Sequence, residues 1–313
     1  MKRIAVLGEG LVEVQGAAHG LKIGYGGDAI NTAIALAHLG QMPNFSSMEI
    51  SFFSAFGTEE KSSHIVEQCA LQGVDMSHTL RIEDKHAGLY LIESDANGAR
   101  YCSYWRDNSA ARFWFDHLED EQIFDILKDY SLVYLTGVTL GIQTSDNLDR
   151  LLALIAQLRR AGCTICFASH YHDDLWPCTS SAQKAYQRML ALTDIALMTF
   201  EDNARLFGDP SSQAVMTRVL NQGVTEVALM DGAQSWACLA GQSDTSPASS
   251  ETLGIDEHGN ELGMAEAFNA AYLAARLNGQ SLEQALRFGQ ASADNVRSSS
   301  NLVADAPQTV VVA

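Results

Sequence analysis

The sequence has little positive charge. Its 313 residues include 20 lysines and arginines against 38 aspartates and glutamates, which gives a formal net charge of −18 at pH 7. A protein with this balance cannot neutralise a row of nucleic-acid phosphates, so general nucleic-acid binding is excluded. The same acidity disfavours binding to a membrane surface. If the substrate is an anion, a few basic groups inside a pocket must supply its countercharge.

Long apolar segments are also missing. The apolar run after the first three residues covers only Ile4 to Leu7, which favours a first β-strand over a signal peptide, and we expect no membrane span. The six cysteines are scattered, and the single CxxC pair lies in an expected strand, where residues three apart face opposite sides. We therefore expect reduced thiols and a cytoplasmic protein.

What the sequence does contain is a regular alternation of short apolar runs and helical patterns. We predict strands at residues 3–8, 50–56, 131–137, 163–168, 195–199 and 226–231, and helices at 29–39, 62–72, 147–161, 181–192, 212–221 and 266–279. This alternation is typical of an α/β protein whose mainly parallel sheet is covered by helices. The length suits one large α/β domain or two small ones.

Residues 87–106 depart from this alternation of strands and helices. They indicate a β-hairpin that turns at 95–98. A three-residue loop at 96–98 pairs Tyr90 with Tyr104 and puts Arg106 on the same face. Two phenols and a guanidinium on one face can cover a polyhydroxy acid, and the guanidinium can hold a carboxylate with two hydrogen bonds. Alternatively, these side chains only pack. A loop one residue shorter would send the two tyrosines to opposite faces.

A glycine-rich segment, GYGGDAIN, precedes the first predicted helix. Gly26 and Gly27 let the backbone approach a ligand closely, Asp28 can cap the helix, and Asn31 lies about one turn further on. These side chains suit sugar hydroxyls, although a glycine-rich helix start without a ligand has the same appearance. The segment is neither a Walker A loop nor a Rossmann fingerprint.

A second glycine-led turn, formed by Gly263, Met264, Ala265 and Glu266, opens the last predicted helix. Helix N-termini attract anions, so this turn can be a phosphate-transfer site. A carboxylate in a first helical turn is equally what an ordinary helix start favours.

Taken together, the segments GYGGDAINTAIALA, GLYLIESDANGAR, YWRDNSAARFW and AFNAAYLAARLNG resemble the ribokinase-like (PfkB) carbohydrate kinases, and among them the 2-keto-3-deoxygluconate kinases, over nearly the whole chain. The resemblance implies a three-layer α/β/α sandwich with a small β-sheet lid, in one domain spanning 1–313 with the lid at about 9–25 and 78–106. It implies phosphorylation of a sugar-acid primary hydroxyl with ATP and Mg²⁺. It also implies a homodimer, or a higher homo-oligomer, formed through the lid.

The resemblance also assigns site residues, none of them as ligands of a protein-bound metal. The substrate positions are Gly26, Gly27, Asp28, Asn31, Tyr90, Tyr104, Arg106 and His172. The catalytic positions are Gly263, Met264, Ala265 and Glu266, with Glu266 as the base. The nucleotide positions are Thr199, Asp202, Gly232 and Asn295.

Several catalytic and nucleotide positions depart from the family pattern. Glu266 replaces an aspartate, Ala265 replaces a glycine, and His172 replaces an arginine, while Met230 and Asp231 replace a basic pair. A base displaced by about 1 Å can cost ~100-fold in rate.

These departures leave three hypotheses open. The first is a working sugar-acid kinase. The second is a non-catalytic sugar-acid-binding protein on the same scaffold, with a sensing or regulatory role. The third is a metal-dependent activity at His170 and His172, because an HxH after a strand can place two imidazoles on one face and Asp174 can join them.

Overall fold

The structure is a computed structural model that describes residues 1–17, 20–94, 100–232, 234–241 and 263–298. The predicted hairpin turn at 95–98 lies outside the described residues.

A central sheet of eight strands forms the middle layer, in the order β12-β11-β10-β9-β8-β1-β4-β5. Every neighbouring pair is parallel except β11 and β12. The strands are β1 (Lys2–Leu7), β4 (Met48–Gly57), β5 (Thr79–Ile82), β8 (Leu132–Thr136), β9 (Thr164–Ala168), β10 (Ile195–Thr199), β11 (Glu226–Asp231) and β12 (Gln234–Leu239). All six predicted strands are confirmed; the edge strands β5 and β12 were not predicted.

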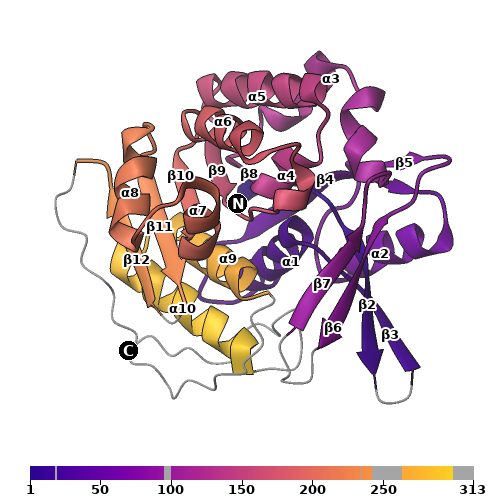
Figure 1. The fold of residues 1–313 in the computed structure, drawn as a ribbon, viewed down its shortest axis with the longest axis horizontal. Helices are drawn as coiled ribbons and strands as arrows, with labels where there is room; N and C mark the ends of the chain where they lie inside the picture. Colours follow the sequence, from indigo (N-terminus) through magenta and orange to yellow (C-terminus); the bar gives the residue numbers. More distant parts are fainter. Residues whose placement is uncertain (18–19, 95–99, 233, 242–262, 299–313) are drawn as a thin grey trace.

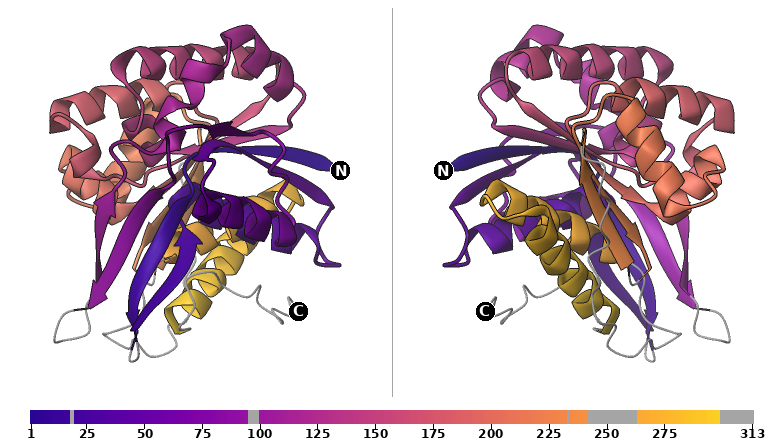
Figure 2. Two further views of the ribbon diagram at one scale, coloured as in Figure 1. Left: turned by 90° about the vertical axis from the view of Figure 1, so that its right-hand side faces the viewer. Right: turned by 90° about the vertical axis from the view of Figure 1, so that its left-hand side faces the viewer.

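Helices cover both faces of this sheet (Figures 1 and 2). One apolar cluster joins the sheet to α1 (Asp28–Gly40), α2 (Glu60–Leu71), α9 (Met264–Leu277) and α10 (Leu282–Ser298). A second cluster joins the other face to α3 (Asp120–Leu127), α4 (Gly137–Gly141), α5 (Ser145–Arg160), α6 (Thr179–Leu190), α7 (Phe200–Phe207) and α8 (Ser212–Asn221), together with the 3₁₀ helix at Ala110–His117. The predicted three-layer sandwich and its six helices are confirmed, with ends displaced by up to two residues. None of the described helices combines the length and the apolar character needed to cross a membrane.

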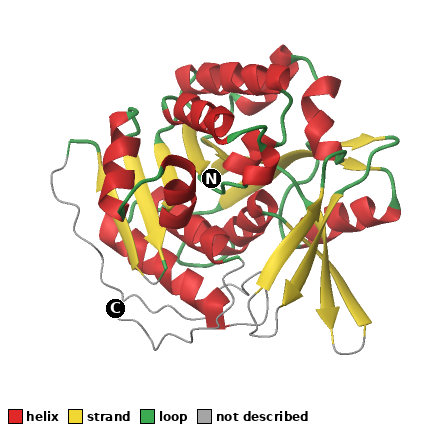
Figure 3. Cartoon of the chain, viewed as in Figure 1, coloured by secondary structure: helices red, strands yellow, loops and turns green. Residues whose placement is uncertain are grey.

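A separate four-stranded sheet, which we call the lid, projects from the body of the protein (Figures 1 and 3). Its order is β3-β2-β6-β7, with β2 (Leu11–Ala17), β3 (Gly20–Gly26), β6 (Gly88–Ser94) and β7 (Arg100–Trp105). Tyr90 pairs with Tyr104, so the predicted register is confirmed. Thr79–Ile82 fell inside the segment assigned to the lid, but it pairs with β4 as β5 of the central sheet.

Candidate active site

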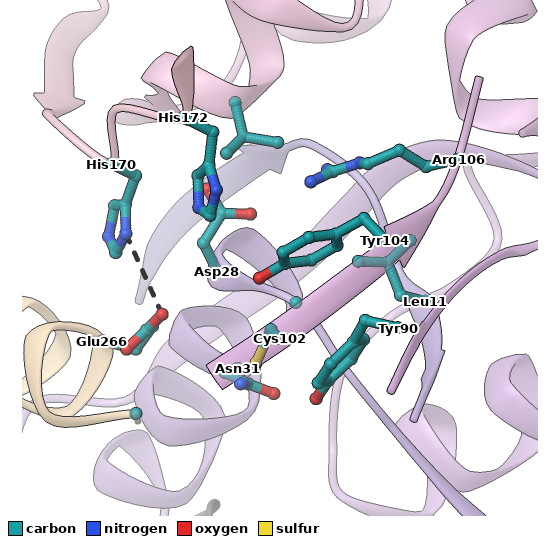
Figure 4. Close-up of a pocket in the computed structure, with 13 residues that line it drawn as sticks. Leu11, Asp28, Asn31, Tyr90, Cys102, Tyr104, Arg106, His170, His172 and Glu266 are labelled. Carbon is teal, nitrogen blue, oxygen red and sulfur yellow. Dashed lines mark ion pairs between the residues drawn. The ribbon is translucent and has the colours of Figure 1, made fainter. Parts of the chain in front are cut away.

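A cavity lies between the lid and the carboxyl ends of the central strands (Figure 4). It holds about 550 Å³ of space not filled by protein atoms, part of it open to solvent. Its walls include seven of the eight predicted substrate residues: Gly27, Asp28, Asn31, Tyr90, Tyr104, Arg106 and His172. We call it the sugar-side cavity. Gly26, the eighth, is not among the residues that line it.

The lid supplies an aromatic wall. The rings of Tyr90 and Tyr104 stack with their centroids 5.8 Å apart. The Tyr90 hydroxyl donates a hydrogen bond to the buried carboxylate of Glu13 on β2. Burial raises the pKa of both phenols above the usual value, and for Tyr90 the Glu13 charge raises the pKa further. Both tyrosines are therefore neutral groups that can pack on a sugar and donate or accept hydrogen bonds.

The guanidinium of Arg106 is not wholly available to a ligand, because part of it pairs with Glu9. Its Nε donates to Oε2 of Glu9 over 2.9 Å, and its Nη2 donates to the same oxygen. Only 4% of the Arg106 side chain and 1% of that of Glu9 are exposed. One edge of the guanidinium is thus occupied, and the Nη1 end is what remains for a ligand. Sequence reasoning missed Glu9 and Glu13 because nothing in the local pattern marks them as buried.

The opposite wall comes from the start of α1. The helix is capped by Gly27 and not by Asp28, whose side chain makes no capping hydrogen bond, so that expectation was wrong. Asp28 is instead the first helical residue and faces the cavity (Figure 4). Oδ2 of Asp28 and Oδ1 of Asn31 are buried acceptors that have no hydrogen-bond partner among the described residues. Buried acceptors are rarely left unpaired, so these two atoms are suited to donors on a ligand.

The two glycines that precede α1 are required for different reasons. Gly27 has a φ of 134°, and a Cβ there would lie 2.7 Å from the backbone oxygen of Glu9. A Cβ on Gly26 would lie 2.3 Å from the Tyr90 hydroxyl. Gly26 therefore acts on the cavity indirectly, because it leaves room for the Tyr90–Glu13 hydrogen bond.

We expect Gly26→Ala to push the Tyr90 ring out of place. Overpacking of this kind typically costs about 1–3 kcal/mol, and the displaced ring should weaken sugar-acid binding. Urea denaturation and calorimetric titration measure the two effects. Gly24→Ala is the matched control on the same strand, because its Cβ would meet nothing closer than 3.7 Å. Wild-type stability and affinity in Gly26→Ala would contradict this account.

A second cavity adjoins the first on the other side of the loop after β9. It holds about 860 Å³ of unfilled space, part of it open solvent, and Thr199, Asp202 and Gly232 line it as expected. We call it the nucleotide-side cavity. Asn295 is not among its lining residues and is exposed on α10; Arg297, two residues further along that helix, lines the cavity in its place. Sequence reasoning did not identify Arg297.

Two of the carboxylates in the nucleotide-side cavity already have partners. Asp202 accepts a hydrogen bond of 2.7 Å from Ser169, and Asp231 accepts one of 2.8 Å from Ser212. Thr199 is the N-cap of α7, and its hydroxyl accepts from the backbone nitrogen of Asp202.

The start of α9 stands between the two cavities. Gly263 and Glu266 line the sugar-side cavity, whereas Met264 and Ala265 line the nucleotide-side cavity. Gly263 has a φ of 85° and begins the helix, so the backbone N–H groups of the first turn are free of helical acceptors. This turn can therefore contact ligands in both cavities.

His170 and His172 also line both cavities. Nδ1 of His170 lies 3.9 Å from Oε1 of Glu266 (Figure 4, dashed line). Burial raises the pKa of Glu266, an effect that the charge of His170 partly offsets. Burial also lowers the pKa of His172, and the nearby Arg106 lowers it further. His172 is therefore a neutral side chain where the family pattern has an arginine.

The hypothesis of a metal site at His170 and His172 gains no support from this geometry. Within the described part of the chain, no group of three or more histidine, cysteine, aspartate and glutamate side chains could hold a metal ion.

Comparisons with known proteins show the family to which this chain belongs. The model of the pfkB family carbohydrate kinases matches residues 1–309. The chain is 32% identical over 295 residues to 2-dehydro-3-deoxygluconokinase of Escherichia coli K12, covering 94% of each chain, and 31% identical over 297 residues to that of Dickeya dadantii, again covering 94% of each. Among solved structures, it is similar to a putative ribokinase II of E. coli in complex with ATP and Mg²⁺, with a TM-score of 0.78, 18% identity and coverage of 97% and 95% of the two chains. Since the family model spans nearly the whole chain, this protein belongs to the pfkB family of carbohydrate kinases.

Proposed function

We propose that this protein phosphorylates 2-keto-3-deoxygluconate, or a closely related sugar acid, at a primary hydroxyl with ATP and Mg²⁺. The observation that carries the proposal is the meeting of two cavities at the first turn of α9, with Glu266 on one side and, beside it, backbone N–H groups that have no acceptor within the helix. Phosphoryl transfer depends mainly on placing two ligands in line and stabilising charge between them. The names of the similar E. coli and D. dadantii kinases suggest the substrate, since 2-dehydro-3-deoxygluconate is the same compound.

The sugar-side cavity suits a small oxidised sugar. Asp28 and Asn31 offer unpartnered acceptors for its hydroxyl groups. The Nη1 end of Arg106 offers a positive group for its carboxylate, and Tyr104 lies beneath that guanidinium, 5.3 Å from its carbon to the ring centroid.

The nucleotide-side cavity offers fewer suitable groups for Mg-ATP than the sugar-side cavity offers for a sugar acid. Arg297 and the N-terminus of α9 favour phosphates, and the carboxylates of Glu201 and Asp202 are the hard oxygen ligands that Mg²⁺ prefers. When bound, Mg²⁺ would neutralise part of the phosphate charge. Glu266 then takes the proton from the sugar hydroxyl. The first turn of α9 holds the phosphoryl group while it is transferred.

A second candidate is a sugar-acid-binding protein without kinase activity. The observation that favours it is the charge of the nucleotide-side cavity. Among the described residues that line it, three are carboxylates, Glu201, Asp202 and Asp231, and one is an arginine, Arg297. Without bound Mg²⁺ such a surface repels a triphosphate.

Two measurements separate these candidates. Calorimetric titration with the keto acid and with Mg-ATP reports binding, and a coupled assay of ADP release reports turnover. The kinase proposal expects both ligands to bind and ADP release to depend on the sugar acid. Binding of the sugar acid without binding of Mg-ATP would overturn it in favour of the second candidate, and binding of neither would overturn both.

We also propose that two copies associate through the outer face of the lid. Cross-strand pairing places Ile23 and Trp105 on the lid face opposite Tyr90, and their side chains are 54% and 58% exposed. Leu21 and Tyr101, also on the lid strands, are 68% and 51% exposed. Apolar surface of this kind on a monomer marks an association site.

We expect the double variant Ile23→Lys, Trp105→Ser to halve the mass of the protein in sedimentation equilibrium. Leu71→Ser is the control, because Leu71 is an equally apolar side chain, 78% exposed, on α2 of the body. A monomeric wild-type protein, or a dimer that survives the double variant, would contradict the lid interface.

A further inference from the structure

We propose that His170 is a positioning residue for Glu266, and that the two side chains hold protons as a single pair at the base of the sugar-side cavity. The inference rests on the proposed kinase function. It concerns a side chain, His170, that the proposed function itself does not use.

The first observation is the enclosure of the pair. Nδ1 of His170 lies 3.9 Å from Oε1 of Glu266, and the two side chains are 11% and 15% exposed. Nε2 of His170 lies 3.4 Å from Nδ2 of Asn269, one turn further along α9, and accepts a hydrogen bond from it when the imidazole is neutral. The imidazole is thus held against α9 at two points. A charge pair so removed from water interacts more strongly than one on the surface.

The second observation is the backbone of His170, which has a φ of 36°, in the left-handed region. A residue with a Cβ costs on the order of 1–2 kcal/mol in this conformation. The surroundings impose it, because the carbonyl of Ser169 accepts from the Gly137 nitrogen over 3.1 Å and from the Tyr186 hydroxyl over 2.7 Å. A Cβ on Gly137 would lie 2.1 Å from that carbonyl oxygen, so the Ser169 carbonyl is closely packed against Gly137 and cannot shift toward it. Strain held in this way is typical of functional sites.

The third observation is the charge that faces the pair. Burial alone would lower the pKa of His170, but the carboxylates of Glu266, Asp28 and Asp202 outweigh it and raise the pKa. These come from three different helices, α9, α1 and α7.

Charged groups also act on the neighbouring imidazole, His172, and Arg297 lines the nucleotide-side cavity together with both histidines. Arg106 of the lid lowers the pKa of His172, while Asp28, Asp174 and Asp202 oppose that effect. The positive charge that the loop after β9 can offer is therefore at His170, beside the base, and not at His172.

The chemical consequence follows from the charge of Glu266. Burial favours its protonated form, which cannot accept a proton, and the positive charge of a protonated His170 acts in the opposite direction, toward the ionised form. In the transfer step the sugar O–H bond breaks and its proton passes to Glu266 as the sugar oxygen bonds to the terminal phosphorus of ATP. The bond from that phosphorus to the bridging oxygen breaks, and its electron pair leaves with ADP. The active form is the singly deprotonated pair, so kcat/KM has a bell-shaped pH profile.

His170→Asn tests the pair, because asparagine removes the titrating ring but tolerates the left-handed backbone. We expect the acid limb of kcat/KM to move to higher pH by on the order of one unit, since Glu266 loses a neighbouring positive charge. The alkaline limb due to the imidazole should disappear. His64→Asn, an exposed position on α2, is the control and should keep the wild-type profile.

A second measurement does not depend on turnover. The imidazole C–H resonance of His170, assigned by its absence in His170→Asn, can be titrated by NMR in the wild-type protein and in Glu266→Gln. We expect the pKa of His170 to fall in Glu266→Gln by on the order of one unit, because its nearest carboxylate is gone. An unchanged pKa there would overturn the pairing even if the kinase is active. An unchanged acid limb in His170→Asn would overturn its role in catalysis.

Discussion

Glu266→Gln is expected to remove nearly all sugar-acid phosphorylation while leaving sugar-acid affinity within a few-fold of wild type. A positioned general base contributes about 10²–10⁴-fold to a rate, and glutamine has nearly the same shape as glutamate but cannot accept the hydroxyl proton at neutral pH. Within α9, Glu266 is the one residue with a carboxylate, and it lines the sugar-side cavity. ADP release in the coupled assay measures the rate, and calorimetry measures the affinity.

Two further variants sharpen this test. Glu266→Asp retains the carboxylate but withdraws it by about 1 Å, and should leave more activity than the glutamine variant while falling below wild type. Glu283→Gln removes an exposed carboxylate of α10 that pairs only with Arg287 among the described residues, and should have no effect. If Glu266→Gln lost less than about threefold in kcat, Glu266 would not be the base.

Arg106→Met is expected to destabilise the whole protein as well as to abolish sugar-acid binding. Arg106 and Glu9 form a buried ion pair, and removing one partner of such a pair leaves an uncompensated charge that costs about 3–5 kcal/mol. Methionine fills similar volume, so little of the loss comes from a cavity. The free energy of unfolding in urea measures the first effect and calorimetric titration the second.

The double variant Glu9→Gln, Arg106→Met separates the two effects. The double variant removes the charge of Glu9, which the single variant leaves unpaired. We therefore expect more than half of the lost stability to return. Affinity for the sugar acid should not return, because no positive group replaces the guanidinium. Restored affinity in the double variant would show that Arg106 acts only through stability, and a single variant as stable as wild type would show that the pair contributes nothing.

The parallel strands and the register of the lid hairpin followed from local pattern. Strands such as Leu132–Thr136 are continuous apolar runs because helices cover both faces of the sheet, and this signal needs no knowledge of distant residues. The pairing of Tyr90 with Tyr104 follows from a period of two and an assumed loop length. The strands β5 and β12 at the edges of the sheet escaped prediction because they are only partly buried and therefore are not continuous apolar runs.

The nucleotide-side residues show where local pattern fails. Asn295 and Arg297 are two apart on α10, so they point to different sides of the helix, and the sequence alone did not indicate which side faces the cavity. Similarly, aspartate is a typical N-cap residue, but Gly27 and not Asp28 is the N-cap of α1. The carboxylate of Asp28 therefore faces the sugar-side cavity.

The sequence by itself determined the family, the layered architecture and most of the side chains that line the sugar-side cavity, because repeating apolar positions and a few rigid motifs are local properties. Only the tertiary structure decided the charge states. Arg106 meets Glu9 across 97 positions, and His170 meets a carboxylate on a helix that begins nearly a hundred residues later. Burial and through-space charge set the pKa of a group, and both depend on which distant segments the fold brings together.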